Sequence, residues 1–207
     1  MKNIKNLLFD LGGVIMDIDK NNCVRAFRQL GLADAGTYFG DFKQTGPFAL
    51  LESGAIDPAE FHRYMHEKIS DVTDAQIDEA FEAFLTGIPV RRLEHLRTLR
   101  RRYGVYMLSN TNPIMWNSFI AQQFRQEGFD RDHYFDGIVT SFEAKVMKPD
   151  AGIFEYARRK LGIDPAATLF LDDSESNCRA AADLGWQTAH VSPGTEFMDI
   201  LDQLHLL

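Results

Sequence analysis

Several polar residues of this 207-residue chain directly follow short apolar runs. They are Asp10, Ser109, Asn110, Asp172 and Asp173. Adjacent carboxylates at the end of a buried run repel each other, and a bound cation relieves that repulsion. Carboxylate oxygens are hard ligands that suit Mg²⁺ rather than zinc, and no His/Cys cluster competes with them. The pattern therefore predicts a Mg²⁺ site that includes Asp172 and Asp173, beside an anionic nucleophile at Asp10.

A phosphorylated substrate fits the remaining polar residues. Ser109 and the backbone amides near Asn110 precede a predicted helix near Pro113 and could hold a phosphate at its N-terminus. Lys148 follows a later apolar run and could balance the negative charge and keep Asp10 ionised. Each residue alone has a simpler role as a helix cap, turn former or loop lysine. Their joint occurrence in this order favours the chemical role.

The apolar runs alternate with amphipathic stretches. The runs are 4–9, 105–108, 138–139, 168–171 and 188–191, and the stretches are 90–103, 150–161 and 174–184. Runs that are apolar on both faces fit buried parallel strands. The alternation predicts an α/β fold with a doubly wound, parallel, Rossmann-like sheet. In such sheets ligands bind outside the carboxyl ends of the strands, where the polar residues gather.

The segment from about residue 19 to 87 breaks this alternation. It contains four helical candidates and no convincing strand: 20–30, 38–51, 58–69 and 74–85. Pro58 after Asp57 is typical of a first helical turn behind its N-cap, and Thr73 or Asp74 could cap the last helix. We therefore expect a core of residues 1–16 and 90–207 with a four-helix cap, residues 17–89, inserted after the first strand.

Composition limits the partners. The net charge of −8 disfavours nucleic acids and anionic membranes, which reward basic surfaces. No stretch approaches the roughly 20 apolar residues of a membrane span, and Asp10 interrupts the apolar run near the N-terminus. Two distant cysteines favour a reducing cytoplasm. We expect a cytoplasmic monomer or homodimer that acts on a small molecule.

The order of four motifs resembles the haloacid dehalogenase (HAD) superfamily over nearly the whole chain. The motifs are FDLGGV, LSN, KPD and FLDDSESN. The helical insertion is similar to the small cap of the first subclass of that superfamily. The stretches FDLGGVIMDID and LESGAID resemble the branch of sugar-phosphate phosphatases that includes α-glucose-1-phosphate phosphatase.

This resemblance implies a mechanism. Asp10 would attack phosphorus and form an aspartyl-phosphate, which water then hydrolyses. Asp10, the backbone carbonyl of Gly12, and Asp172 or Asp173 would hold Mg²⁺, while Lys148 would bind the phosphoryl group together with Ser109 and Asn110. The implied function is a Mg²⁺-dependent phosphatase of a small phosphate ester, with a hexose 1-phosphate as the first expectation.

One position departs from the family. Most phosphatases of the superfamily carry an aspartate two residues after the nucleophile as general acid and base, and this chain has Gly12 there. Asp17 and Asp19 are nearby substitutes, although helix capping suits Asp19 better. Glu52 and Gly54, near a predicted cap turn, are candidate substrate contacts, and core or turn roles fit them equally well.

Two other functions remain open at this stage. A haloacid dehalogenase would use Asp10 to attack carbon without a metal, which leaves Asp172 and Asp173 unexplained. A catalytically impaired phosphosugar-binding protein would explain Gly12 but would not need an ionised nucleophile.

Arg91 and Arg92 are expected to lie on a solvated helix face.

Overall fold

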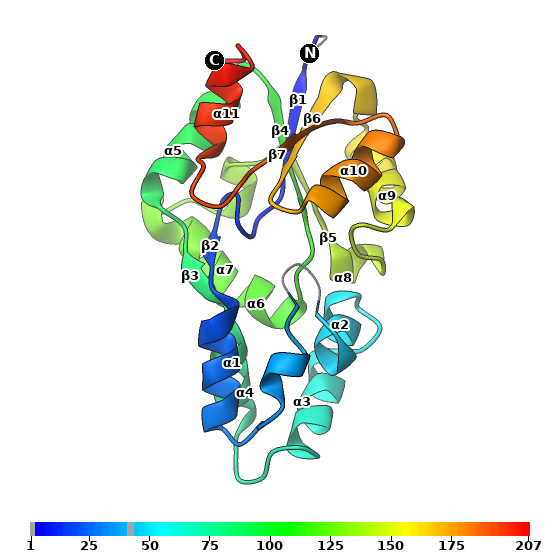
Figure 1. Ribbon diagram of the computed structural model, residues 1–207. Coiled ribbons are helices and arrows are strands. Elements are labelled where there is room, and N and C mark those ends of the chain that lie inside the picture. Colours follow the sequence, from blue (N-terminus) through cyan, green and yellow to red (C-terminus); the bar gives the residue numbers. More distant parts are fainter. Residues whose placement is uncertain (1–2, 41–43) are drawn as a thin grey trace.

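A five-stranded parallel sheet forms the centre of the core in the computed structural model, which describes residues 3–40 and 44–207. Its strand order is β5-β4-β1-β6-β7 (Figure 1). The strands are β1 (Asn6–Phe9), β4 (Gly104–Ser109), β5 (Gly137–Thr140), β6 (Thr168–Asp172) and β7 (Gln187–His190). Every adjacent pair is parallel. The predicted α/β fold class is confirmed.

Helices cover both faces of this sheet. Leu7 and Phe9 of β1 belong to one hydrophobic cluster, and Leu8, between them, belongs to another. The first cluster includes residues of α5 (Val90–Leu99) and α11 (Phe197–Gln203), and the second includes residues of α9 (Ala151–Leu161) and α10 (Glu175–Asp183). Because successive strand residues point to opposite faces, the buried part of β1, residues 7–9, is apolar at every position, as its run predicted.

The remaining core helices are short. They are α6 (Pro113–Asn117), α7 (Phe119–Phe124) and α8 (Ser141–Ala144), with 3-10 turns at Arg125–Glu127, Arg131–His133 and Pro165–Ala167. Asn112 caps α6, and its side chain accepts a 3.0 Å hydrogen bond from the Met115 amide. The sequence also allowed Ser109 as the cap of this helix. In the structure Ser109 is the last residue of β4 and does not cap α6. No helix within the described residues is long and apolar enough to cross a membrane.

The insertion contains the four predicted helices. They are α1 (Lys20–Gln29), α2 (Gly46–Glu52), α3 (Pro58–His66) and α4 (Asp74–Glu82), with a 3-10 turn at Ala35–Thr37. Asp57 and Thr73, which are two of the predicted caps, form capping boxes at the starts of α3 and α4. The second helix begins at Gly46 rather than residue 38, and part of the predicted range, 41–43, lies outside the described residues.

An aromatic cluster forms the centre of the insertion. Its rings, with centroids as close as 4.6 Å, come from different segments: Phe27, Phe39, Phe48, Phe61 and Phe81. Edge-to-face pairs of this kind add to the free energy of burial. The cluster therefore packs the helices of the insertion, which lies below the sheet in Figure 1, against one another.

Two short strands connect the insertion to the core, where the sequence predicted none. β2 (Asp17–Ile18) pairs antiparallel with β3 (Leu85–Gly87). Strands of two and three residues are too short to show the alternation that identifies a strand in sequence. The division into core 1–16 and 90–207 and cap 17–89 stays a prediction, and this ribbon lies at its boundaries.

Arg92 of α5 is buried beside this ribbon, so the expectation of a solvated face is wrong for this residue. It is 8% exposed. Its guanidinium donates to the Ile15 carbonyl at 3.1 Å, to Asp17 at 2.7 Å and to Glu196 at 2.9 Å. A planar donor fork can bind several acceptors at once, which keeps a buried arginine paired.

Candidate active site

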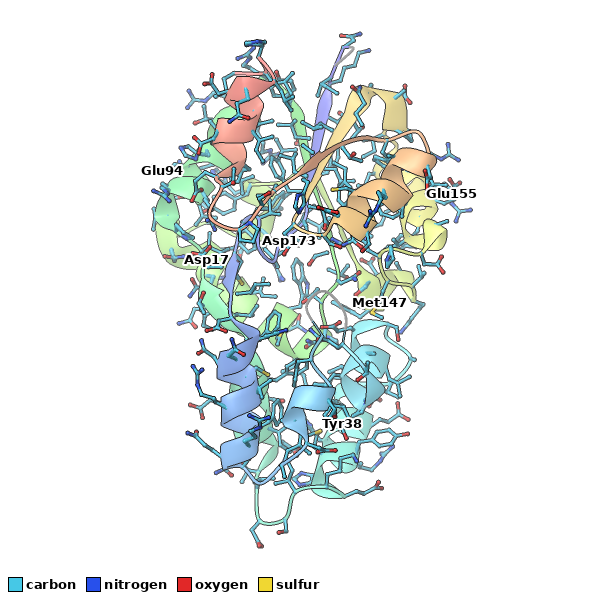
Figure 2. All side chains as sticks on the ribbon, viewed as in Figure 1. Asp17, Tyr38, Glu94, Met147, Glu155 and Asp173 are labelled. Carbon is cyan, nitrogen blue, oxygen red and sulfur yellow. The ribbon has the colours of Figure 1, made fainter. Side chains whose placement is uncertain are left out.

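The carboxyl ends of β1, β4 and β6 open into one pocket between the core and the insertion. Core residues on its wall include Asp10, Gly12, Ser109, Asn110, Lys148 and Asp173. Insertion residues on its wall include Ile18, Gln44, Glu52, Phe84 and Leu85. Figure 2 shows Asp173 at the end of the core that faces the insertion. The predicted convergence at the strand ends is thus present in the structure.

Asp10 is held at the end of β1. Its amide donates to the Leu171 carbonyl at 2.9 Å, and its Oδ1 accepts from the Leu11 amide at 2.7 Å and lies 2.8 Å from Lys148 Nζ. Burial raises the pKa of Asp10 well above its ordinary value, the Lys148 charge lowers it, and Asp172 raises it again. A nucleophilic carboxylate at this position therefore needs Lys148 and further positive charge.

Lys148 lies between two buried carboxylates. Its Nζ is 2.6 Å from Asp172 Oδ2 and also donates to the Leu108 carbonyl at 3.0 Å. Burial favours the neutral amine, but Asp10 and Asp172 hold the pKa of Lys148 above its usual range. Asn110 positions the backbone of Lys148, because the Asn110 side chain donates to the Lys148 carbonyl at 3.0 Å and accepts from the Lys148 amide at 2.9 Å.

The two adjacent aspartates differ in environment. Asp172 is fully buried, and its Oδ1 accepts from the Ser174 amide at 2.8 Å and from Asn177 Nδ2 at 2.9 Å. Asp173 lines the pocket, and burial together with the Asp172 charge raises its pKa to about 6. Ser174 caps α10, so the start of this helix fixes the Asp172 carboxylate.

Gly13 makes room for Asp173, and the sequence analysis did not identify it. Its φ is +70°, and a Cβ there would lie 2.3 Å from Asp173 Oδ2. Only glycine combines this backbone conformation with so close a carboxylate. The sequence signal that could have identified Gly13 is the second glycine of the motif FDLGGV.

The donor set fits a hard divalent cation. One carboxylate oxygen from each of Asp10, Asp172 and Asp173 lies within 4.8 Å of the others. Two buried carboxylates and the half-buried Asp173 face the single charge of Lys148, which leaves excess negative charge in a region of low dielectric. Oxygen ligands of this kind suit Mg²⁺. Gly12 lines the same pocket, where its backbone carbonyl is the further predicted ligand.

Glu52 lies on the insertion side of the pocket. It is 8% exposed, and burial raises its pKa to about 8, with a hydrogen bond from Gln44 opposing the shift. Its backbone carbonyl accepts a 2.6 Å hydrogen bond from Ser141 Oγ of the core. Gln44 was missed by the sequence analysis, because an isolated glutamine before a helix has no distinguishing pattern.

Gly54 lies outside this pocket, against the core. The Lys145 Nζ donates to its carbonyl at 2.6 Å, and it lines a separate cavity with Phe142. Its φ is +64°, and a Cβ would lie 2.2 Å from the Phe142 carbonyl oxygen. This geometry gives Gly54 a role in seating the insertion on the core.

The two nearby aspartates have other partners. Asp17 pairs with Arg92, and Asp19 caps α1 by accepting from the Asn21 amide at 2.9 Å. Neither is among the residues that line the pocket. A general acid must therefore come from a different part of the pocket wall, or from solvent.

Comparison with known proteins identifies the family. A model described as haloacid dehalogenase-like hydrolase matches residues 4–185. The chain is 35% identical over 195 residues to a D-ribitol-5-phosphate phosphatase of Bacteroides thetaiotaomicron, covering 94% of this chain and 95% of the relative.

Solved structures agree with this assignment. The wild-type form of a HAD family enzyme of Bacteroides thetaiotaomicron, in complex with magnesium and inorganic phosphate, superposes with a TM-score of 0.89 at 39% identity, covering 96% of this chain and 99% of that one. A HAD-like family hydrolase of Porphyromonas gingivalis superposes with a TM-score of 0.90 at 30% identity, covering 98% of each chain. The predicted enzyme class and the helical cap after the first strand are confirmed, and the chain belongs to the haloacid dehalogenase-like hydrolases.

Proposed function

We propose that this protein is a Mg²⁺-dependent phosphatase that transfers the phosphoryl group of a small sugar or sugar-alcohol phosphate to Asp10. The observation that carries this proposal is the joint placement of Asp10, Lys148 and Asp173 on the wall of one pocket, with the buried Asp172 paired to Lys148. The magnesium and phosphate bound to a solved relative support it, as does the ribitol-5-phosphate activity of a relative from the same organism.

The chain's own residues account for the chemistry. A carboxylate oxygen of Asp10 forms a bond to phosphorus, the ester P–O bond breaks, and the departing oxygen takes up a proton. Lys148 keeps Asp10 ionised, and Ser109 with the neighbouring backbone amides binds the phosphoryl oxygens. Mg²⁺, when bound, would neutralise charge on those oxygens. Water then hydrolyses the aspartyl-phosphate, which releases phosphate and restores Asp10.

For the substrate, we favour a primary phosphate ester of a sugar alcohol or sugar, because the relative named above acts on ribitol 5-phosphate. The sequence alone favoured a hexose 1-phosphate, and the branch resemblance to α-glucose-1-phosphate phosphatase stays a prediction. Both ester types belong in the same assay.

The two alternatives are less well supported. Attack on carbon by a dehalogenase would need no cation and would leave the cluster of Asp10, Asp172 and Asp173 without a purpose. A binding protein would gain nothing from a lysine that keeps a nucleophile ionised.

Release of phosphate from a panel of esters tests the proposal. The panel contains ribitol 5-phosphate, glucose 1-phosphate, glucose 6-phosphate and p-nitrophenyl phosphate, each with Mg²⁺ and with EDTA. We expect Mg²⁺-dependent release that EDTA abolishes. Chloride release from 2-chloropropionate in EDTA would instead favour the dehalogenase. Binding of the esters without turnover of p-nitrophenyl phosphate would favour the binding protein.

A further inference from the structure

The leaving group lacks its usual proton donor in this active site. Gly12 occupies the position two residues after the nucleophile and carries no carboxyl. An alkoxide leaving group is strongly basic, and protonation by a positioned acid typically contributes about a hundredfold to ten-thousandfold to the rate. If the proposed phosphatase acts on an alkyl ester, another group must supply this proton. This inference rests on the proposed function.

Glu52 is a carboxyl group on the wall of the same pocket. It ends α2 of the insertion and lines the cavity together with Asp10 and Gly12. The hydrogen bond from Ser141 Oγ to the Glu52 carbonyl anchors its backbone to the core. Glu52 therefore belongs to the insertion wall of the pocket, whereas the core wall holds the nucleophile, and we expect the leaving group on the insertion side.

The surroundings keep this carboxyl neutral. Burial raises its pKa to about 8, so it is protonated at neutral pH and can donate. The groups around it are Gln44, Cys23 of α1 and, across the pocket, Lys148, Asp10 and Asp173. Burial is the largest cause of the shift, and the opposing cause is the Gln44 hydrogen bond. Carboxylic acids with such environments are the usual general acids of enzymes.

Gln44 adds a second, independent observation. It is 8% exposed and lines the pocket beside Glu52. Its Oε1 is buried and has no hydrogen-bond partner within residues 3–40 and 44–207. A buried acceptor without a partner costs free energy unless a ligand satisfies it. A hydroxyl group of the leaving group is the donor that this position lacks.

We propose that Glu52 is the general acid of this enzyme and that Gln44 accepts a hydrogen bond from a hydroxyl of the same leaving group. As the ester P–O bond breaks, its electron pair stays on the leaving oxygen, and the Glu52 O–H proton transfers to that oxygen. The resulting Glu52 carboxylate then takes a proton from the water that attacks the aspartyl-phosphate, which restores the neutral acid. The substrate class is an alkyl phosphate whose leaving group is a neutral polyol.

The Glu52→Gln variant tests this role by leaving-group dependence. Glutamine keeps the volume and a donor group but cannot transfer a proton. At neutral pH we expect kcat/KM for ribitol 5-phosphate to fall by about a hundredfold or more. The value for p-nitrophenyl phosphate, whose leaving group needs no proton, should stay within about tenfold. In the wild type the ribitol 5-phosphate value should fall as pH rises through about 8, since the acid ionises there, and the variant should lose that dependence.

Two controls keep the test decisive. Glu79→Gln, at an exposed glutamate of α4, should change neither ester. Gly12→Asp in the Glu52→Gln background should restore alkyl ester turnover, because a Cβ at Gly12 meets only Ile18 at 3.6 Å. Equal losses for both esters, or no loss for either, would overturn the role of Glu52. Absence of phosphate release by the wild type from any ester would overturn the proposed function, and this inference with it.

Discussion

The two walls of the pocket are built differently. On the core side, Asp10 and Asp172 follow strand ends, and Lys148 Nζ lies 2.8 Å from Asp10 and 2.6 Å from Asp172. On the insertion wall, Glu52 and Gln44 come from around a single short helix, and the Gln44 Oε1 lacks a partner. On the core wall, Lys148 is paired with two carboxylates before any substrate binds, whereas the insertion wall leaves a hydrogen bond for the substrate to make. We therefore expect the nucleophile and the cation site to come from the core, and the groups that contact the leaving group to come from the insertion.

Removal of the nucleophile from the core wall should reduce turnover more than any other change. Asp10→Asn keeps the side-chain volume but removes the nucleophilic charge, so turnover of every ester should fall below detection. Steady-state phosphate release checks this, with the near-UV circular dichroism of the variant as a control for folding. Turnover within about tenfold of the wild type would refute the covalent mechanism.

Weakening the cation site should have the next largest effect. Asp173→Asn replaces a pocket-facing carboxylate by a poorer ligand for a hard cation. The Mg²⁺ concentration for half-maximal rate should rise by about tenfold or more, and replacing Asp172 as well should raise it further. A titration of rate against Mg²⁺ measures both. Full activity in EDTA would show that the carboxylate cluster serves another purpose.

A smaller effect is expected where the insertion meets the core. A methyl group at Gly54 would lie 2.2 Å from the Phe142 carbonyl oxygen, so Gly54→Ala should displace the insertion wall. We expect kcat/KM for ribitol 5-phosphate to fall by about tenfold, because misplaced groups bind the leaving group poorly.

Gly128→Ala is the matched control for this change. Gly128 also has a positive φ, +81°, but nothing lies within 4 Å of its Cβ position. Both variants therefore carry a similar backbone strain of about 1 kcal/mol, and only Gly54→Ala should change kcat/KM. Equal kinetic effects in the two variants would mean that strain, not the contact between insertion and core, is responsible.

The smallest effect concerns stability and pH. The folded-state pKa of Glu52, about 8, exceeds its ordinary value of 4.5, so the folded protein binds the proton more tightly than the unfolded chain. This contribution is complete below about pH 4.5 and decreases as pH rises toward about 8, by about 1 kcal/mol per unit. Urea unfolding at about pH 6 and about pH 7, compared between wild type and Glu52→Gln, measures it. An identical pH dependence in both proteins would mean that Glu52 is not buried in its neutral form.

The core wall could be predicted from the sequence because the strands are buried on both faces. Their runs are therefore apolar, and the polar residues that follow them, such as Asp10 and Asp172, are conspicuous. Asp57 and Thr73 were identified for a similar reason, since helix caps carry local signatures.

The insertion wall and the connections between segments could not be predicted in the same way. Gln44 and Gly54 acquire their positions from contacts with residues far away in the sequence, which no local pattern records. Arg92 was expected to be solvated because its helix is rich in charge, yet Asp17 and Glu196 bury it from distant segments. Ser141, which joins the core to Glu52, ends the apolar run at 138–139, but that position gave no sign of its contact with Glu52.

Direct observation of the phosphorylated enzyme tests the central claim most closely. Wild-type protein and Mg²⁺ are mixed with limiting ribitol 5-phosphate, quenched in acid at successive times, digested, and analysed by mass spectrometry. The mechanism predicts a transient phosphoryl group on the peptide that contains Asp10, which forms before free phosphate and is absent from Asp10→Asn. Release of phosphate without any phosphorylated Asp10 peptide, or with the phosphoryl group on another residue, would contradict it.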